Sequence, residues 1–330
     1  MAATSFGSII SPTMAVSRFD GERFQTPQLR EVRPLELHPA THALHYGSAC
    51  FEGLKAHRGH DGVVRVFRMD RHAQRMATSA GLLCLPVPPV ELLTTMVRHV
   101  VAANRDDVPP PPGALYLRPV LIGTDENIGA AAHPSSTALL YVVASPVGDY
   151  FDRSRALTVM IETELPRTTP QFGVVKTGAN YAMALGVIRR AHAEHGADQV
   201  LFAPNGDVQE TGASNFLLID GDRIITRALD RTFLHGVTRD SILTLAAESG
   251  YEIEERELPV TEVVDRAPEV EMALSGTAAV LAAVGALVHK GETITVGDGL
   301  PGPRTTKLRE SLQAVQRGEA PDRWGWTTAV

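Results

Sequence analysis

The chain has 330 residues, of which 44% are hydrophobic and 21% charged, and its formal net charge is −7. This length predicts two domains or one large one, with enough apolar residues to build a core. The acidic balance, without any block rich in Lys and Arg, argues against nucleic-acid binding. No apolar run reaches the roughly 18 residues of a membrane span, and no signal-peptide pattern is evident. We therefore expect a cytoplasmic protein with small-molecule partners and no membrane contact.

Cysteine and histidine give no sign of a metal site. The two cysteines, Cys50 and Cys84, form no CxxC pair, and we expect both to be small core residues. His42 and His45 lie three residues apart, but without a third ligand they are a weak basis for a metal centre. The sequence therefore predicts neither a metal nor a disulfide framework.

The first half of the chain mixes predicted strands and helices. Residues rich in β-branched and aromatic types predict strands over 63–67, 114–122 and 137–144. Apolar residues at helical spacing predict helices over 71–83 and 90–103. The loop 123–136 is long, and loops of this length are often functional.

A break in the pattern over 145–155, which contains Pro146 and Gly148, predicts a linker. It divides the chain into a small N-terminal α/β domain (1–145), a linker (146–156) and a large C-terminal domain (157–330). In the second domain we predict strands over 157–164, 198–203, 215–219, 223–226 and 270–274, and helices over 180–194, over 238–250 and from Thr261. Asn205-Gly206 predicts a hairpin that returns through 207–210. The fold class is α+β with mixed sheets, and a site is expected in the cleft between the domains.

Lysine is rare, which narrows the search for lysine chemistry: it occurs only at 55, 176, 290 and 307. Lys176 follows an apolar stretch and precedes a glycine turn, at Gly178, that leads into a predicted helix. A lysine beside apolar residues loses the hydration that favours its ammonium form, and the neutral amine can then attack a carbonyl. A surface lysine at a helix start explains the local sequence equally well. We expect Lys290 and Lys307 to be solvated, whereas Lys55 is a rival that is harder to exclude.

Two segments could bind an anion such as phosphate. The segment 236–238 opens a predicted helix with Thr238 as its N-cap, and free amides at a helix start attract anions. Taken alone, the segment fits an ordinary capped helix better than an anion site. The segment 275–278, Ser-Gly-Thr-Ala, offers hydroxyls and amides in a tight turn. Neither a Walker loop nor a GxGxxG fingerprint is present.

Glu210 lies at the end of the predicted hairpin. An exposed glutamate is the usual interpretation at such a position. A buried one could instead keep a pyridine nitrogen protonated, which would make the ring an effective electron sink.

Taken together, seven motifs in this order resemble the fold-type IV pyridoxal-phosphate enzymes, and among them the branched-chain aminotransferases. The motifs are HALHYGSACFEG (42–53), HAQRM (72–76), YLRP (116–119), KTGANY (176–181), ETGASN (210–215), GVTRD (236–240) and SGTA (275–278). The segment DRWGW (322–326) is similar to their C-terminal tail. The resemblance extends from about residue 19 to the end of the chain.

The resemblance implies that pyridoxal 5′-phosphate is the cofactor and gives each matched residue a role. Lys176 would be the Schiff-base lysine and the acid/base that moves the proton between substrate Cα and cofactor C4′. Glu210 would pair with the pyridine nitrogen, and Tyr181 would donate to the ring hydroxyl. The phosphate would be held by Arg75, the amides of Val237 and Thr238, and Thr277.

It also implies a substrate site. The side-chain pocket would be lined by Tyr46, Phe51, Gly53, Val147 and Tyr150. Tyr116 and Arg118 would border it and help to accept glutamate. The amides of Thr277 and Ala278 would bind the α-carboxylate. The sequence departs from the family pattern at Val147, where an aromatic residue is common, and after Ala279, and both departures concern substrate range.

The implied activity is reversible amino transfer between Leu, Ile or Val and 2-oxoglutarate by a ping-pong mechanism. The implied assembly is a homodimer in which the loop 123–136 reaches the partner's site. Because enzymes of this fold share one scaffold, a D-amino acid or (R)-amine transaminase, or an aminodeoxychorismate lyase, is the alternative. A non-catalytic binding protein on the same fold is a further alternative, and the presence of both Lys176 and Glu210 argues against it.

Overall fold

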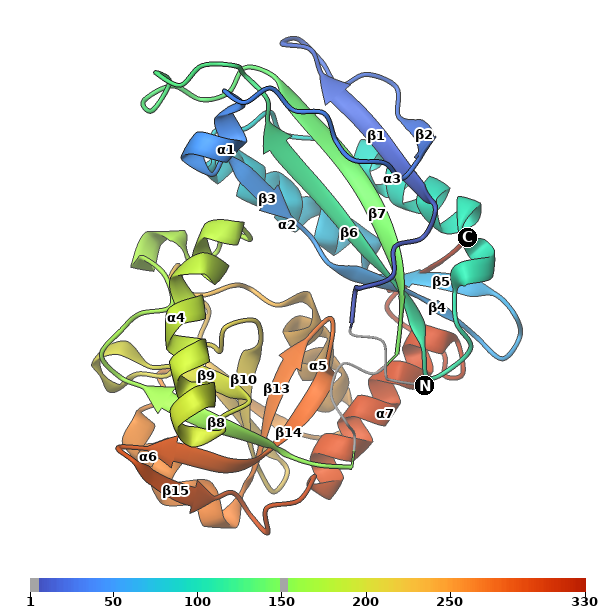
Figure 1. Cartoon of the computed structure of the whole chain (residues 1–330). Coiled ribbons are helices and arrows are strands. Elements are labelled where there is room, and N and C mark those ends of the chain that lie inside the picture. Colours follow the sequence, from blue (N-terminus) through green and yellow to red (C-terminus); the bar gives the residue numbers. More distant parts are fainter. Residues whose placement is uncertain (1–5, 149–153) are drawn as a thin grey trace. The chain divides into compact units, whose positions relative to one another are not determined.

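The computed structural model describes residues 6–148 and 154–330 of the chain (Figure 1). By their contacts, the residues group into two units. Unit 1 comprises Met1–Tyr150, Val175–Gly178 and Ala314–Val330, and unit 2 comprises Phe151–Val174 and Ala179–Gln313. The boundaries predicted from the sequence describe two continuous stretches and stay a prediction. In the structure, the short segment that contains Lys176 groups with the N-terminal residues.

Unit 1 is built on one antiparallel sheet. Its strands are β1 (Thr13–Phe19), β2 (Gln28–Glu31), β3 (Ala49–Phe51), β4 (Leu54–Arg58), β5 (Val64–Phe67), β6 (Ala114–Gly123), β7 (Ala138–Val147) and β16 (Thr327–Ala329). Within the described residues their order is β16-β5-β4-β6-β7-β1-β2, and β3 pairs with β6. Its helices are α1 (His42–Tyr46), α2 (Met69–Leu82) and α3 (Val90–Ala103). Helices α2 and α3 cover one face of the sheet (Figure 1).

Alternation along the strands gives this sheet two different faces. On β6, Leu115, Leu117 and Leu121 point into the core formed with α2 and α3. The residues between them, Tyr116 and Arg118 among them, therefore lie on the opposite face. The cross-strand partners of this second face are Lys55 on β4, Phe51 on β3 and the β7 residues Val143, Ser145 and Val147. The period of two thus gathers much of the predicted substrate site on one face of the sheet.

Unit 2 is built on a mixed sheet. Its strands are β8 (Leu157–Glu162), β9 (Gln199–Phe202), β10 (Asn215–Asp220), β11 (Arg223–Arg227), β12 (Glu252–Arg256), β13 (Glu271–Gly276), β14 (Val280–His289) and β15 (Glu292–Thr295). In the part of the chain that the structure describes, their order is β12-β11-β10-β13-β14-β8-β9, with β15 paired to β14. Strand β8 runs parallel to both β9 and β14, and β11 runs parallel to β12, whereas the other pairs are antiparallel.

The helices of unit 2 are α4 (Gly178–His195), α5 (Val237–Glu248), α6 (Val260–Arg266) and α7 (Pro303–Arg317). The first residue of α4, Gly178, and the last residues of α7, from Ala314 on, group with unit 1. The buried face of α4 packs on Val200 and Phe202 of β9. Short 3-10 turns in the chain span Arg105–Asp107, Pro170–Phe172, Pro204–Gly206 and Ala267–Glu269.

The elements predicted from the sequence are largely confirmed. The helix predicted over 90–103 has those bounds in α3, and the strands predicted over 215–219 and 223–226 form β10 and β11, which pair as a hairpin. Strand β7 runs to Val147, so the predicted pattern break at 145 is wrong by three residues. The turn at Asn205-Gly206 forms, and Phe202 exchanges backbone hydrogen bonds with Gln209 and Glu210, but 207–210 is not a regular strand.

No helix in the described ranges is long and apolar enough to cross a membrane. Among the same residues, no group of three or more His, Cys, Asp or Glu side chains could hold a metal ion.

Cys50 is buried as predicted, whereas Cys84 is exposed and the prediction that it is a core residue is wrong. Cys84 lies beyond the end of α2 with a positive φ of 54°.

Candidate active site

Lys176 is held by its backbone on unit 1. Its N–H donates to Ser79 Oγ of α2 at 3.0 Å, and its carbonyl accepts from the N–H of Phe51 at 3.0 Å. The next residue, Thr177, donates from Oγ1 to the carbonyl of Ala49 at 2.7 Å. Strand β3 and helix α2 thereby fix the lysine from two sides. Its Nζ lies 5.1 Å from the centroid of the Phe51 ring, so an aromatic face is part of its surroundings.

The other lysines divide as predicted. Lys290 and Lys307 are exposed. Lys55 is buried on β4 and pairs across the sheet with Tyr116, so it lies on the same face as the predicted substrate residues. Their exposure argues against Lys290 and Lys307 as the reactive lysine. Lys55 remains the structural rival of Lys176.

Phe51, Tyr116 and Arg118 form one cluster on the second face of the unit 1 sheet. The Arg118 guanidinium lies 4.6 Å from the centroid of the Phe51 ring and 5.3 Å from that of Tyr116. Its Nη2 donates to the Tyr116 hydroxyl at 3.1 Å. Gly53 faces the same hydroxyl, and a Cβ added there would lie 1.9 Å from it. A side chain at 53 would therefore displace the Tyr116 ring. The structure brings together four of the residues predicted to contact substrate.

Arg75 lies on α2 in a network that the sequence analysis did not predict. It donates from Nε and Nη2 to the two carboxylate oxygens of Glu52, at 2.7 and 2.9 Å. His72 contacts the same carboxylate through Nδ1 at 2.7 Å. The spacing of His72 and Arg75 on a predicted helix indicates a shared face, but no sequence signal pairs that face with Glu52.

Glu210 is buried, with 2% of its surface exposed, which excludes the interpretation of an exposed strand end. Its Oε1 lies 2.8 Å from Nη1 of Arg167 and accepts the N–H of Leu234 at 2.9 Å. Arg167 is equally buried, and its guanidinium lies 5.5 Å from the centroid of the Tyr181 ring. Unit 2 thus brings together Glu210 and Tyr181 through Arg167, a residue that the sequence analysis missed and that no motif indicated.

The predicted anion site at 236–238 is a helix start, but its cap differs from the prediction. The N-cap of α5 is Gly236, and Val237 and Thr238 are its first two residues, so the assignment of Thr238 as N-cap is wrong. Within the described part of the chain, this N-cap makes no side-chain hydrogen bond. Glycine adopts the extended N-cap backbone without contributing a side chain, which leaves the first amides available to an external anion.

The second predicted anion site, 275–278, spans the end of β13 and the turn into β14. Ser275 is buried, and its hydroxyl has no hydrogen-bond partner among the described residues. Thr277 and Ala278 are half-buried in the turn. The turn closes at Val280, whose φ of 62° lies in the left-handed region.

Three residues predicted to line the substrate pocket remain. Tyr46 is partly exposed at the end of α1, and its hydroxyl donates to the carbonyl of Ile128 in the loop 123–136. Val147 is buried at the end of β7 opposite Ala114. Tyr150 lies outside the described residues.

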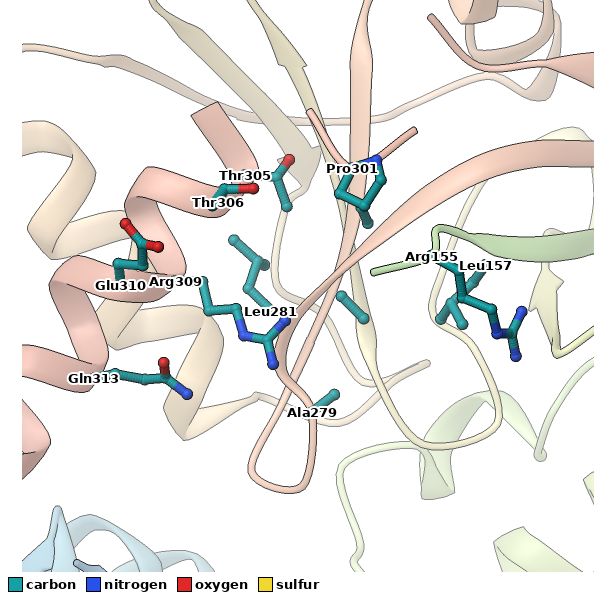
Figure 2. A pocket seen from close by; sticks show the side chains of 12 residues that line it. Arg155, Leu157, Ala279, Leu281, Pro301, Thr305, Thr306, Arg309, Glu310 and Gln313 are labelled. Carbon is teal, nitrogen blue, oxygen red and sulfur yellow. The ribbon is translucent and has the colours of Figure 1, made fainter. Parts of the chain in front are cut away.

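A cavity of about 140 Å³ lies in unit 2 between α7 and the start of β14 (Figure 2). Thr305, Arg309 and Gln313 of α7 line one side, and Leu281 lies opposite (Figure 2). Ala279, which follows the Thr277–Ala278 turn, also lines it, but none of the predicted site residues does.

Comparison with known proteins identifies the family. The family model for amino-transferase class IV matches residues 49–286. The chain belongs to the class IV aminotransferases. The family and enzyme class predicted from the sequence are thereby confirmed.

Its relatives are named branched-chain aminotransferases. The chain is 37% identical to the chloroplastic branched-chain-amino-acid aminotransferase 5 of Arabidopsis thaliana, covering 94% of this chain and 75% of that protein. It is 36% identical to the branched-chain-amino-acid aminotransferase of Mycolicibacterium smegmatis, with 92% and 86% covered. The Bacillus subtilis branched-chain-amino-acid aminotransferase 2 is 33% identical, with 99% and 92% covered.

Solved structures confirm the predicted α+β, fold-type IV architecture. The branched-chain amino acid aminotransferase of Escherichia coli matches with a TM-score of 0.80 at 27% identity, covering 96% of this chain and 98% of that one. The branched-chain amino acid aminotransferase of Thermobaculum terrenum, solved in its pyridoxal-phosphate form, has the same fold, with a TM-score of 0.79 at 22% identity, covering 97% of this chain and 98% of that one. Pyridoxal 5′-phosphate, the cofactor predicted from the sequence, is the cofactor of this family.

The residues of this chain fit such a cofactor. The start of α5 offers amides that no side chain caps, and Ser275 offers a buried hydroxyl without a partner in the described ranges. Glu210 offers a buried carboxylate already fixed by Arg167. The amides suit an anion such as a phosphate, the hydroxyl suits a hydrogen-bond acceptor, and the carboxylate suits a protonated ring nitrogen.

Proposed function

We propose that this protein is a branched-chain amino acid transaminase that exchanges the amino group of Leu, Ile or Val with 2-oxoglutarate, using pyridoxal 5′-phosphate. The names of its relatives and its coverage of their length support the substrate class. The observation in the structure that carries the proposal is the buried Glu210–Arg167 ion pair, because it holds a charged carboxylate in the interior, where it can serve as the partner of a ring nitrogen.

We assign the cofactor to the residues that the family motifs indicate. Lys176 would carry it covalently, Glu210 would face the ring nitrogen and Tyr181 the ring hydroxyl. The phosphate would be held by Arg75, the Val237 and Thr238 amides and Thr277. The fixed backbone of Lys176, the Glu210–Arg167 pair and the uncapped start of α5 support these roles.

We assign the substrate mainly to the second face of the unit 1 sheet. Phe51, Gly53, Tyr116 and Val147 would form an apolar wall for the branched side chain, and Tyr46 and Tyr150 would complete it. Arg118 would receive the side-chain carboxylate of 2-oxoglutarate, and the Thr277 and Ala278 amides would bind the α-carboxylate. The contacts of Arg118 with two aromatic rings support this assignment, because they place a charge beside an apolar surface.

When bound, pyridoxal 5′-phosphate supplies an electron sink for the charge left on substrate Cα after its proton is removed. The protein would supply the base. Lys176 would take the Cα proton at Nζ and return it at the neighbouring carbon, since one amine held on a fixed backbone can reach both. The carboxylate of Glu210 would keep a proton on the ring nitrogen.

The test is an assay of the purified full chain with L-leucine and 2-oxoglutarate, with D-alanine as the competing donor. We expect glutamate formation from L-leucine and parallel lines in double-reciprocal plots, as a ping-pong mechanism requires. Activity with D-alanine alone would reject the proposal and favour a D-amino acid transaminase.

We further propose that the enzyme works as a cytoplasmic homodimer in which the loop 123–136 reaches the partner's site. The loop is tied at its base by Asp125, which accepts hydrogen bonds from the backbone and hydroxyls of Ser136 and Thr137. Sedimentation at assay concentrations should give the mass of two chains, and a monomer that is fully active would contradict the dimer. Fractionation of the source cells tests the compartment.

A further inference from the structure

Glu52 is a buried carboxylate that has no role in the proposed function. It lies between β3 and β4, and 0% of its surface is exposed. A carboxylate in a protein interior loses its hydration, and it is tolerated only where opposite charge and hydrogen bonds compensate for that loss. The groups around Glu52 therefore indicate what it holds.

Two residues on one face of α2 bind this carboxylate. Arg75 forms a fork, with Nε donating to Oε1 and Nη2 to Oε2. His72 lies 2.7 Å from Oε2 through Nδ1, and the N–H of Gly53 donates to the same oxygen at 3.1 Å. A forked pair fixes the orientation of a guanidinium as well as its position. We call the edge that carries Nε and Nη2 the inner edge of the Arg75 guanidinium, and the edge that carries Nη1 the outer edge. The pair with Glu52 holds the inner edge.

The charges of the three side chains balance. Burial alone would raise the pKa of Glu52, but the Arg75 charge and the hydrogen bonds from α2 outweigh it and hold that pKa well below its ordinary value. The pKa of His72 is lowered, chiefly because burial disfavours its charged form, so His72 is neutral and donates from Nδ1. One negative, one positive and one neutral group give no net charge at neutral pH.

Stability alone is a weak reason for this arrangement. Replacing a buried ion pair with apolar residues of similar volume is often neutral or stabilising. Orientation is a better reason, because the fork with Glu52 engages Nε and Nη2 together and so fixes the plane of the guanidinium as well as its position. The side chain of Arg75 is 12% exposed, so it is nearly but not fully enclosed.

We propose that Glu52, supported by His72, is a positioning residue that fixes the Arg75 guanidinium with its outer edge toward the phosphate group of the cofactor. This inference rests on the proposed function, in which Arg75 holds that phosphate. Orienting the guanidinium before the cofactor arrives lowers the entropy lost on binding.

The test compares two ligands on the cofactor-stripped full chain by absorbance titration: pyridoxal 5′-phosphate, and pyridoxal, which lacks the phosphate. Glu52→Gln keeps the shape of the side chain but removes its charge and one acceptor. We expect it to weaken binding of pyridoxal 5′-phosphate by about 10-fold or more, the usual effect of removing a residue that orients a ligand. We expect the affinity for pyridoxal to stay unchanged.

Arg75→Ala supplies the second arm. It should weaken pyridoxal 5′-phosphate binding by itself, and Glu52→Gln added to it should cause no further loss, because no guanidinium remains to be positioned. If Arg75→Ala weakens binding while Glu52→Gln alone does not, only the inference fails. If Arg75→Ala has no effect, the proposed phosphate role of Arg75 fails, and the inference fails with it.

Two controls separate positioning from damage to the fold. Glu262→Gln breaks the ion pair with Arg256 in unit 2 and should leave both titrations unchanged. If Glu52→Gln does not fold, His72→Phe keeps the bulk of the ring and removes its donor, and it should weaken only pyridoxal 5′-phosphate binding, by roughly 3-fold, the smaller effect of one neutral hydrogen bond. Equal losses for both ligands would overturn the inference.

Discussion

At the scale of single residues, the burial of Glu210 fixes the position and the surroundings of its charge. Its carboxylate is enclosed, paired with Arg167 and bound by the amide of Leu234. Such a group cannot move away from its partner without leaving a buried charge unpaired. The position of its charge is therefore set by the fold.

Glu210→Gln should lower kcat/KM for L-leucine by about 10²-fold, because a neutral amide no longer stabilises charge on the ring nitrogen, and lost electrostatic contacts in active sites cost amounts of this order. The measurement is steady-state kinetics at a cofactor occupancy matched by absorbance. Glu262→Gln is the matched control and should keep its activity. A Glu210→Gln variant as active as the parent at full occupancy would contradict the role of Glu210.

Sequence reasoning reached single residues unevenly. Lys176 and Glu210 were predicted because they lie in motifs, and because only four lysines occur in the chain. Arg167 and Glu52 were not, since each acts through a partner 43 or 23 residues away. Only the packing of separate elements brings such pairs together.

Among the elements, the approach to Lys176 shows how closely two loops can meet. Gly173 follows the 3-10 turn Pro170–Phe172, and a Cβ added to it would lie 2.1 Å from the backbone carbonyl carbon of Thr232. Backbone cannot give way as the end of a flexible side chain can. At Gly178, the first residue of α4, an added Cβ would instead lie in open space.

Gly173→Ala should therefore lower the melting temperature by about 2–4 °C, as overpacking against backbone costs roughly 1–3 kcal/mol. Gly178→Ala is the matched control on the other side of Lys176, and we expect a change of less than about 1 °C from it. Calorimetry or circular dichroism measures both. If the two variants melt together, the close approach at Gly173 is not structurally important.

Secondary structure followed from local pattern where elements were long. Helix α3 and strands β10 and β11 were predicted because periodicity and residue type act locally. Strands β3 and β4 were missed, since each is short and Gly53 interrupts the run between them. The N-cap of α5 was misplaced because threonine caps are common, whereas here glycine leaves the site open.

At the scale of the whole molecule, the burial of His57 makes the stability of the folded chain sensitive to acid. His57 on β4 is buried, and neither ring nitrogen has a hydrogen-bond partner among the described residues. Burial, together with the charges of Lys55 and Arg317, lowers its pKa to about 3 from an ordinary 6.5. Between these values the unfolded chain binds a proton at His57 that the folded chain does not bind, so stability falls as pH falls.

We expect the melting temperature to decrease from pH 7 to pH 5, with His57 contributing up to about 1.4 kcal/mol per pH unit below 6.5. The lowered pKa of Glu52 acts in the same direction below its ordinary 4.5. His57→Leu should flatten the decrease between pH 6.5 and 5, while His60→Gln, at an exposed position, should not. A slope that His57→Leu leaves unchanged would contradict this account.

The central claim is that Lys176, and not the buried Lys55, carries the cofactor. It is tested most directly by borohydride reduction of the full chain with bound pyridoxal 5′-phosphate, followed by digestion and mass spectrometry. The account predicts the reduced cofactor on the peptide that contains Lys176, and loss of the visible absorbance band in Lys176→Ala. Reduced cofactor on Lys55, or a parent protein that binds no pyridoxal 5′-phosphate, would contradict it.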